Sequence, residues 1–285
     1  MKLILLLFIM ISCNQVDNIS DSINKTNRVP TSSESTTKRW TGSVSSSYFP
    51  FNLEISSSFS SEEQTEIENM MNEWDSNISE IDIFTSPVNT IANFTPSSLG
   101  DYNDTTFGIY KAQDWHSSLS SSALAVTQYF GIRRNTGTSS EFIDMLHADI
   151  IINYEHFDFS TDSTFGTYDL PSVVLHELGH FIGLSHHYSF TPASVMYPTL
   201  TMFDYERLVY QHDIDAVLDL YVNSSAPAIV SSSGSSTSPL VKSSIRDSNN
   251  DSDGEVIRGV FELRPGGQCR HIENGVVKKV HFIKN

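Results

Sequence analysis

Residues 176–186 read HELGHFIGLSH, and the rest of the chain can be interpreted around this stretch. In a helix, His176 and His180 lie one turn apart on the same face, so both imidazoles can reach one metal ion while Glu177 lies beside them. Gly183 can adopt a positive φ that ends the helix and turns the chain, so that His186 adds a third nitrogen ligand. Three protein ligands leave a fourth position for water, which is typical of a catalytic zinc site.

The alternative interpretation is an ordinary amphipathic helix that happens to contain histidines. HExxH alone is short enough to recur by chance. The longer pattern HExxHxxGxxH also fixes a glycine and a third histidine, and each of these has a separate geometric role. The full pattern therefore favours the metal site.

Composition limits the class of protein. A chain of 285 residues with 39% hydrophobic content can form one large or two small domains with a real core. The net charge of -17 argues against nucleic-acid binding, which relies on clustered Lys and Arg. The acidic composition can serve solubility or calcium binding. Four aspartates in polar loops could bind Ca²⁺, although they lack EF-hand spacing: Asp101, Asp104, Asp158 and Asp162.

Residues 1–13 have the composition of an export signal. One lysine is followed by an apolar run too short to span a bilayer, and then by Ser12 and Cys13. This ending resembles the bacterial lipobox, in which the cysteine is lipidated after cleavage. We therefore expect an exported protein, either a cell-surface or outer-membrane lipoprotein anchored at Cys13 or, if Cys13 is incidental, a secreted one. Residues 14–37 are polar and read as a flexible tether.

Hydrophobic periodicity and turn residues predict the elements of the main domain. We expect strands at 48–55, 81–84, 106–110, 123–130 and 148–154. A helix of about 15 residues should begin after Ser60 or Ser61, with Ile67, Met70, Met71 and Trp74 on its buried side. A second helix should run from Pro171 to Gly183, and a third from Asp204 or Gln211 to Tyr221.

The C-terminal part has a different composition. Residues 223–250 form a Ser-rich linker, and residues 251–285 contain two β-rich runs with an Asn274-Gly275 hairpin signal. A segment this short cannot form a secure core of its own. This small β-hairpin appendage therefore either docks on the main domain or is only marginally stable.

The sequence Ser194-Val195-Met196-Tyr197-Pro198 resembles the Met-turn of metzincin metalloproteases, and the SVMYP form is most similar to that of matrixins. The resemblance covers residues 38–222. It implies an α+β metzincin fold with a twisted, mostly parallel sheet, an antiparallel edge strand, three helices and zinc in the cleft. It also implies that Met196 supports the histidines from beneath without binding the ion.

The resemblance has further implications for the cleft. Residues 211–221 are similar to the last matrixin helix, whose acidic residues anchor the Met-turn. Ala148-Asp149-Ile150 is similar to the edge strand along which the substrate lies extended and antiparallel, a form of β-addition. Pro198 begins the wall of the pocket for the residue after the cut, which we expect to accept a medium apolar side chain such as Leu. His156 resembles a fragment of the family's structural zinc loop, but the segment is too short for a second zinc site.

The function implied is a zinc endopeptidase that acts on extracellular or surface proteins, with Glu177 as general base and with the protein as a monomer. The alternative is a surface-displayed binding or adhesion protein that keeps the fold without proteolysis as its task. No segment matches the PRCGxPD-like cysteine switch of matrix metalloproteases, so we expect another form of restraint. Cys269 is either a reactive thiol or, as we favour, a small half-buried side chain.

Overall fold

The computed structural model describes residues 36–41, 48–223, 254–266 and 269–280. All of them belong to one compact unit, Ser35–Asn285. The predicted signal segment with Cys13, nearly all of the tether and nearly all of the linker lie outside the described residues. Within the described residues, no helix is long and apolar enough to cross a membrane.

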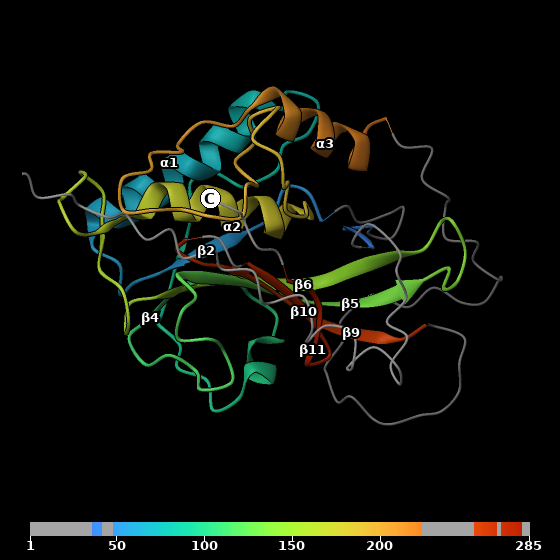
Figure 1. Cartoon of the computed structure of the whole chain (residues 1–285), viewed down its shortest axis with the longest axis horizontal. Coiled ribbons are helices and arrows are strands. Elements are labelled where there is room, and N and C mark those ends of the chain that lie inside the picture. The colour runs from blue at the N-terminus through green and yellow to red at the C-terminus, as the bar shows by residue number, and fades with distance from the viewer. Residues whose placement is uncertain (1–35, 42–47, 224–253, 267–268, 281–285) are drawn as a thin grey trace, which may run out of the picture. The chain divides into compact units, whose positions relative to one another are not determined.

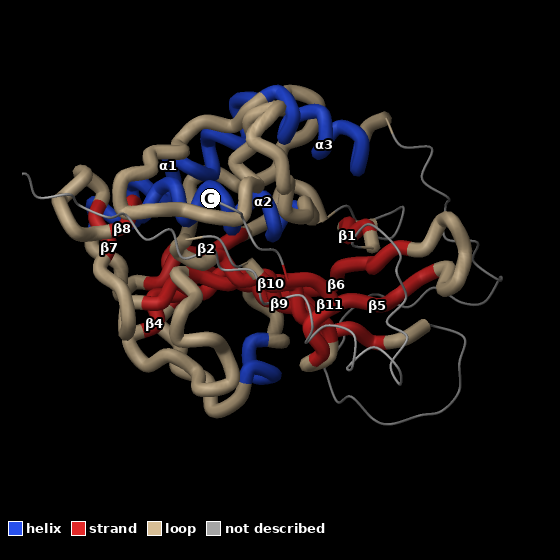
Figure 2. The backbone as a smooth tube through the Cα atoms, in the orientation of Figure 1, coloured by secondary structure: helices blue, strands red, loops and turns tan. Residues whose placement is uncertain are grey.

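A nine-stranded mixed sheet forms the centre of this unit, with the strands in the order β11-β10-β9-β5-β6-β4-β2-β3 and with β1 paired to β6 (Figure 2). The strands are β1 (Thr37–Arg39), β2 (Leu53–Ser56), β3 (Thr90–Ile91), β4 (Phe107–Ala112), β5 (Ala125–Arg134), β6 (Phe142–Asn153), β9 (Val256–Leu263), β10 (Arg270–Glu273) and β11 (Val276–Val280). A separate parallel pair joins β7 (Phe159–Ser160) to β8 (Tyr168–Asp169).

The direction of pairing changes at β5. Strands β1, β2, β3, β4 and β6 are parallel to one another. Strand β5 is antiparallel to β6, and β9, β10 and β11 continue from it in antiparallel pairs. The expected α+β fold with a mostly parallel sheet is confirmed for the main domain, with β5 as its antiparallel strand.

Three α-helices lie on one side of the sheet: α1 (Ser61–Asn77), α2 (Leu170–Ile182) and α3 (Gln211–Tyr221) (Figure 1). A capping box begins α1, in which the Ser60 hydroxyl accepts from the Glu63 amide and the Glu63 carboxylate accepts from the Ser60 amide. Asp169 caps α2 by accepting from the amide of Ser172, and Pro171 occupies its first turn. All three helices match their sequence predictions to within a few residues.

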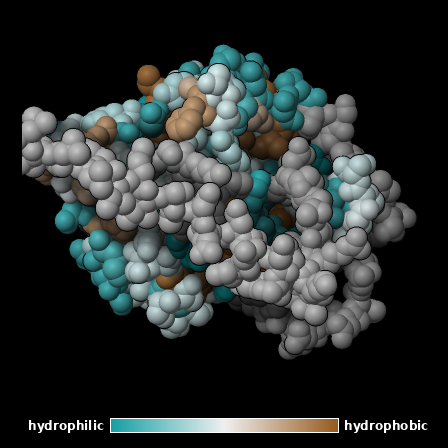
Figure 3. Space-filling model, in the orientation of Figure 1, coloured by the Kyte–Doolittle hydropathy of each residue, from teal (hydrophilic) through white to brown (hydrophobic). Residues whose placement is uncertain are grey.

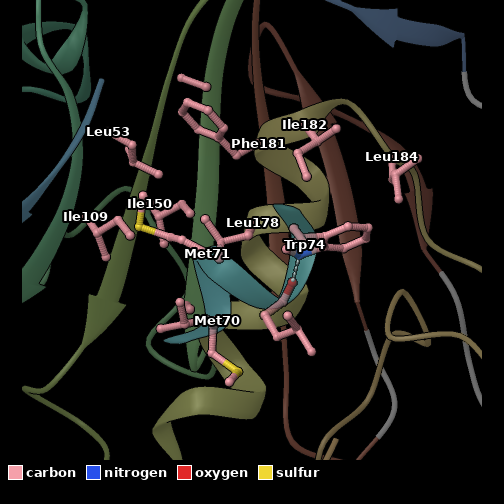
Figure 4. Close-up of a cluster of buried hydrophobic side chains, with 14 of the residues drawn as sticks. Leu53, Met70, Met71, Trp74, Ile109, Ile150, Leu178, Phe181, Ile182 and Leu184 are labelled. Carbon is pink, nitrogen blue, oxygen red and sulfur yellow. Dashed lines mark hydrogen bonds between the residues drawn. The ribbon is translucent and has the colours of Figure 1, made fainter. Parts of the chain in front are cut away.

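The main core lies between these helices and the sheet (Figure 4). The predicted stripe of α1 is buried, and the Trp74 indole donates a hydrogen bond of 3.1 Å to the carbonyl of Leu175 in α2. Leu178 and Phe181 of α2 meet Ile150 of β6 in the same layer. Each fully buried side chain of this size contributes about 1.5–3 kcal/mol, so the zinc-motif helix is held firmly in place.

A second cluster covers the other face of the sheet. It includes Tyr102 from the 3₁₀ turn η1 (Leu99–Tyr102), together with Trp115, Val126 and Ile151. Because alternate residues of a strand point to opposite faces, Ile150 and Ile152 enter the first cluster while Ile151 enters the second. Strand β6 is therefore covered on both faces. On the outside, Figure 3 shows hydrophobic areas over the helical layer, set among hydrophilic ones.

Two predicted strands differ from the structure. Of residues 48–55, only Leu53 onward belongs to a strand, because Pro50 has no amide to donate and Phe51 makes a single bridge to Phe84. Residues 81–84 form no strand, because the amides of Ile83 and Phe84 both donate to the Asp75 carboxylate. The short strands β1 and β3 were not predicted.

Candidate metal centre

The helix α2 is a rigid platform for the site. All of its residues are buried, and its N-terminal cap Asp169 is itself held by the guanidinium of Arg207. The helix ends at Gly183, which has φ of 120°. A Cβ at this position would lie 2.7 Å from the carbonyl oxygen of Lys38, so both the backbone conformation and the space demand glycine.

The turn at Gly183 brings the third histidine to the other two. The ligand atoms of His176, His180 and His186 all lie within 4.8 Å of one another, and all three side chains are buried. In the part of the chain that the structure describes, this is the one group of three or more potential ligands. The structure thus brings together the three residues that the sequence pattern predicted.

Hydrogen bonds to main-chain carbonyls set the tautomers of two of these rings. The Nδ1 atom of His176 lies 2.7 Å from the carbonyl of Val195, and Nδ1 of His180 lies 2.8 Å from the carbonyl of Leu184. A carbonyl only accepts, so each Nδ1 carries the proton and each Nε2 keeps a lone pair. Nε2 of His176 is buried and has no hydrogen-bond partner in the part of the chain that the structure describes, and Nε2 of His180 lies 2.9 Å from Nε2 of His186. Converging lone pairs of this kind fit Zn²⁺.

Burial keeps two of the ligand rings, those of His176 and His180, neutral. It lowers the pKa of His176 to about 4 and the pKa of His180 well below the ordinary histidine value. A histidine binds a metal ion only in its neutral form. Both rings are therefore in the state that binding requires throughout the physiological pH range.

Glu177 lies next to these ligands with one oxygen bound and one free. The Thr127 hydroxyl, on β5, lies 2.5 Å from Oε2 and 3.1 Å from the main-chain oxygen of Glu177. Oε1 is buried and has no partner among the described residues. Burial raises the pKa of Glu177 to about 8, and the Thr127 hydrogen bond opposes that shift. A buried carboxylate with one free oxygen is suited to take up a proton.

Met196, for which the resemblance implies a supporting role, packs against α2 at Gly179. A Cβ on Gly179, between His176 and His180, would lie 2.2 Å from the Met196 sulfur and 3.2 Å from the Trp74 ring. Glycine is therefore the residue that allows the turn to approach the helix so closely. The sequence reasoning did not single out Gly179.

The Met-turn is anchored by α3. The buried carboxylate of Asp213 accepts hydrogen bonds from the Ser194 hydroxyl and, at 2.9 Å, from the Val195 amide. The Val195 carbonyl in turn accepts from His176. A continuous chain of hydrogen bonds thus runs from the last helix to a metal ligand.

A cavity of about 450 Å³ lies beside His176. Residues that follow the Met-turn form one wall, among them Tyr197, Thr199 and Leu200, and Tyr210 also lines the cavity. Pro198 itself is buried and is not among the residues that line the cavity, whereas its neighbours Tyr197 and Thr199 are. The position agrees with a pocket for a substrate side chain next to the metal centre.

The structure does not bring Ala148 and Ile150 to the cleft. Both lie on β6 and are fully buried, and Ile150 pairs with Thr127 of β5 on one side and Ile109 of β4 on the other. A strand with neighbours on both sides has no free backbone groups for a peptide. In the described part of residues 38–222, the antiparallel strand β5 pairs with β6 alone and lies next to Glu177, so the edge-strand assignment moves from 148–150 to β5. The other side of β5 is covered by β9 of the C-terminal segment.

The remaining histidines, the loop aspartates and Cys269 are not part of the three-histidine group. His187 pairs with His212, with 3.1 Å between their ring nitrogens, and exposed His156 lies 3.1 Å from Asn153. Asp101 and Asp162 accept hydrogen bonds from neighbouring loop residues. Cys269 is buried, and burial raises the pKa of its thiol, which donates to the Pro198 carbonyl.

Comparison with known proteins adds one finding. The family model described as matrixin matches residues 60–222, which is more than half of the chain. The match includes the three histidines, Glu177, the Met-turn and α3. No curated protein matches the chain.

Proposed function

This chain belongs to the matrixin family of zinc metalloproteases, and from that premise we propose that it is an endopeptidase with Glu177 as its general base. The observation that carries the proposal is the pairing of three convergent histidines with a buried carboxylate that has one free oxygen. Zn²⁺, when bound by His176, His180 and His186, supplies a Lewis acid that acidifies water and polarises a peptide carbonyl.

The chain's own residues supply the proton transfers. Oε1 of Glu177 accepts the proton of the attacking water and then delivers it to the leaving amine. Thr127 holds the other carboxylate oxygen and so fixes the orientation of the free one. The carbonyls of Val195 and Leu184 keep His176 and His180 oriented toward a common point.

The substrate is, on this proposal, an extended segment of an extracellular or surface protein. The cavity beside His176 is large enough for a medium side chain, and Leu200 and Val195 give it apolar walls. We therefore propose a preference for a residue such as Leu after the cut. Mapping cut sites in a peptide library would test this preference.

The decisive variant is Glu177→Gln, which keeps the shape of the side chain but cannot take up the proton. Peptide hydrolysis by the zinc-loaded whole chain should fall about 10²–10⁴-fold, while zinc content measured by elemental analysis stays at one ion. His186→Ala is the matched comparison and should lose zinc as well as activity. A Glu177→Gln protein that hydrolyses peptides at the parent rate would overturn the role of Glu177.

A chelator separates proteolysis from a binding or adhesion role. Cleavage of an unfolded protein during long incubation should stop when zinc is removed and return when zinc is restored. If the zinc-loaded chain leaves every peptide and unfolded protein intact, the adhesion alternative is favoured instead.

Export and lipidation at Cys13 are a separate proposal that rests on residues 1–13. Acylation would leave the enzyme anchored at a membrane surface and facing extracellular substrates. Mass spectrometry of the N-terminal peptide should show the lipid in the parent and its loss in Cys13→Ser. An unmodified parent peptide would point to a secreted protein.

A further inference from the structure

The C-terminal strand β9 lies along the strand that a substrate would use. Strand β9 pairs antiparallel with β5 from Val256 opposite Ile132 to Leu263 opposite Ala125. Strand β5 is the antiparallel strand of the matrixin domain and carries Thr127, which holds Glu177. Without β9, the outer backbone groups of β5 would be free to bind an extended peptide by β-addition.

One side chain of β9 covers the metal ligands directly. The Phe261 ring stacks on the His180 imidazole, with 4.0 Å between centroids and 2° between planes. Its centroid also lies 5.8 Å from that of His186 and 5.0 Å from the Lys38 ammonium. Phe261 is buried in this position.

The chain then continues between the two walls of the cleft. Leu263 and Gly266 line the cavity beside His176. Arg264 makes a parallel bridge with Thr199, which belongs to the wall segment after the Met-turn, and Cys269 donates to the carbonyl of Pro198 in the same segment. The segment thus contacts both β5 and the opposite wall, as a bound peptide would.

Specific contacts hold this segment in place. Gly259 lies beneath the Tyr129 ring, and a Cβ there would be 1.9 Å from a ring carbon. The Tyr129 hydroxyl lies 2.9 Å from Nε2 of His271 on β10. Arg133 of β5 forms ion pairs with Glu255 and Glu273, at 3.1 and 2.8 Å. These contacts are complementary in shape and in charge, so the strand pairing has one defined register.

We propose that the C-terminal segment, residues 254–280, is a built-in inhibitor that binds the cleft in the manner of a substrate. The inference rests on the proposed peptidase function and names the regulation of the same site. Substrate and β9 require the same backbone groups of β5, so they cannot bind together. The bound segment therefore keeps peptidase activity low, and activity rises when the segment is displaced or removed.

Two substitutions in the whole chain test this competition. Gly259→Val inserts a side chain where the Tyr129 ring lies, and Phe261→Ala removes the ring that covers His180. Each should raise kcat/KM for an internally quenched peptide by about tenfold or more, because the fraction of open enzyme rises. Val276→Thr, at an exposed position of β11, is the matched control and should leave kcat/KM unchanged.

A peptide supplied in trans provides the converse test. A synthetic peptide with the sequence of residues 254–266 should inhibit Gly259→Val competitively, and the same peptide with Phe261→Ala should inhibit it less. Failure of the first peptide to inhibit would overturn the proposal. Cleavage of the parent chain between residues 256 and 264, detected by mass spectrometry, would also overturn it, because the segment would then be a substrate.

Hydrogen exchange gives a readout that does not depend on zinc or on turnover. In chelator-treated protein, amides of residues 125–134 should exchange slowly in the parent and in Val276→Thr, and faster in Gly259→Val. If all forms hydrolyse peptide equally, the inhibitor proposal fails and the peptidase proposal stands. If all forms bind zinc and none hydrolyses peptide, the peptidase proposal itself fails.

Discussion

At the scale of single residues, Thr127 connects β5, the strand proposed to bind substrate, to Glu177, the proposed general base. Its backbone pairs with Ile150 of β6 on one side and Phe261 of β9 on the other, while its hydroxyl holds Glu177. One residue therefore fixes both the position of a bound strand and the direction of the free carboxylate oxygen. No pattern in the sequence marks it, because the contact joins residues distant along the chain.

We expect Thr127→Val to lower kcat about tenfold to a hundredfold with little change in KM, the size of effect seen when a supporting hydrogen bond is lost. The valine keeps the shape of the side chain, so the strand remains in place. The rates should be measured in the Gly259→Val background with zinc content checked. Thr127→Ser restores the hydroxyl and should recover most of kcat; a valine variant with full kcat would show that Glu177 needs no such support.

His147 makes the stability of the fold depend on pH. Burial lowers the pKa of His147, but the hydrogen bond of 2.8 Å to Asp149, with the charges of Asp149 and Asp104, raises it above the ordinary value of 6.5. The folded state thus binds the proton more tightly than the unfolded state. This contribution to stability is present below pH 6.5 and is lost as pH rises through the folded pKa.

Urea unfolding at pH 6 and pH 8 should reveal this linkage. The decrease in unfolding free energy from pH 6 to pH 8 should be smaller in the double variant His147→Gln with Asp149→Asn than in the parent, because burial also raises the pKa of Asp149 to about 6 and the double variant removes both members of the buried pair. An equal decrease in the two proteins would contradict the pKa shift.

At the scale of elements, the fit of the Met-turn against α2 depends on the absence of a side chain at Gly179. We expect Gly179→Ala to destabilise the protein by about 1–3 kcal/mol, because the methyl group overlaps the Met196 sulfur. The affinity of this variant for zinc should also be lower than that of the parent. The double variant Gly179→Ala with Met196→Ala should recover part of the loss, and strictly additive effects in urea unfolding would show that the two residues do not interact.

The elements differ in how far they could be predicted. The helices were predictable because their signals are local: Ser60 with Glu63 begins α1, and Pro171 and Gly183 bound α2. The order of the strands in the sheet was not predictable. Alternation with a period of two residues shows which face of the sheet a side chain occupies, but it does not show which strand lies alongside. The run Ile150-Ile151-Ile152 is typical of a strand covered on both faces, and this signal argued against placing it at the edge.

The same distinction applies to the site. His176, Glu177, His180 and His186 follow from one short motif whose geometry is that of a single helix and turn. Other residues of the cleft lie there because segments distant along the chain pair with one another. The spacing of residues in the sequence therefore could not predict the positions of Phe261, Thr127 and Arg264. The sequence left open whether the C-terminal appendage docks, and in its described residues β9 pairs with β5 from Val256 to Leu263.

At the scale of the whole molecule, the inhibitor and the enzyme belong to the same chain. An intramolecular ligand has an effective concentration that dilution does not change. We therefore expect the low kcat/KM of the parent to stay constant across about a hundredfold dilution. Sedimentation over the same range should show a monomer; activation on dilution would mean that the segment comes from a second copy.

The contact of Gly183 with Lys38 also has a practical consequence for fragments. The match to the family model begins at residue 60. However, the turn at Gly183, which positions His186, packs on the carbonyl of Lys38. The Trp40 indole also donates a hydrogen bond of 2.8 Å to the carbonyl of Phe181. The part of the chain that packs around the metal centre therefore begins before residue 60, where the match to the family model begins. A fragment cut at residue 60 would retain every catalytic group and lose part of the support beneath the third ligand.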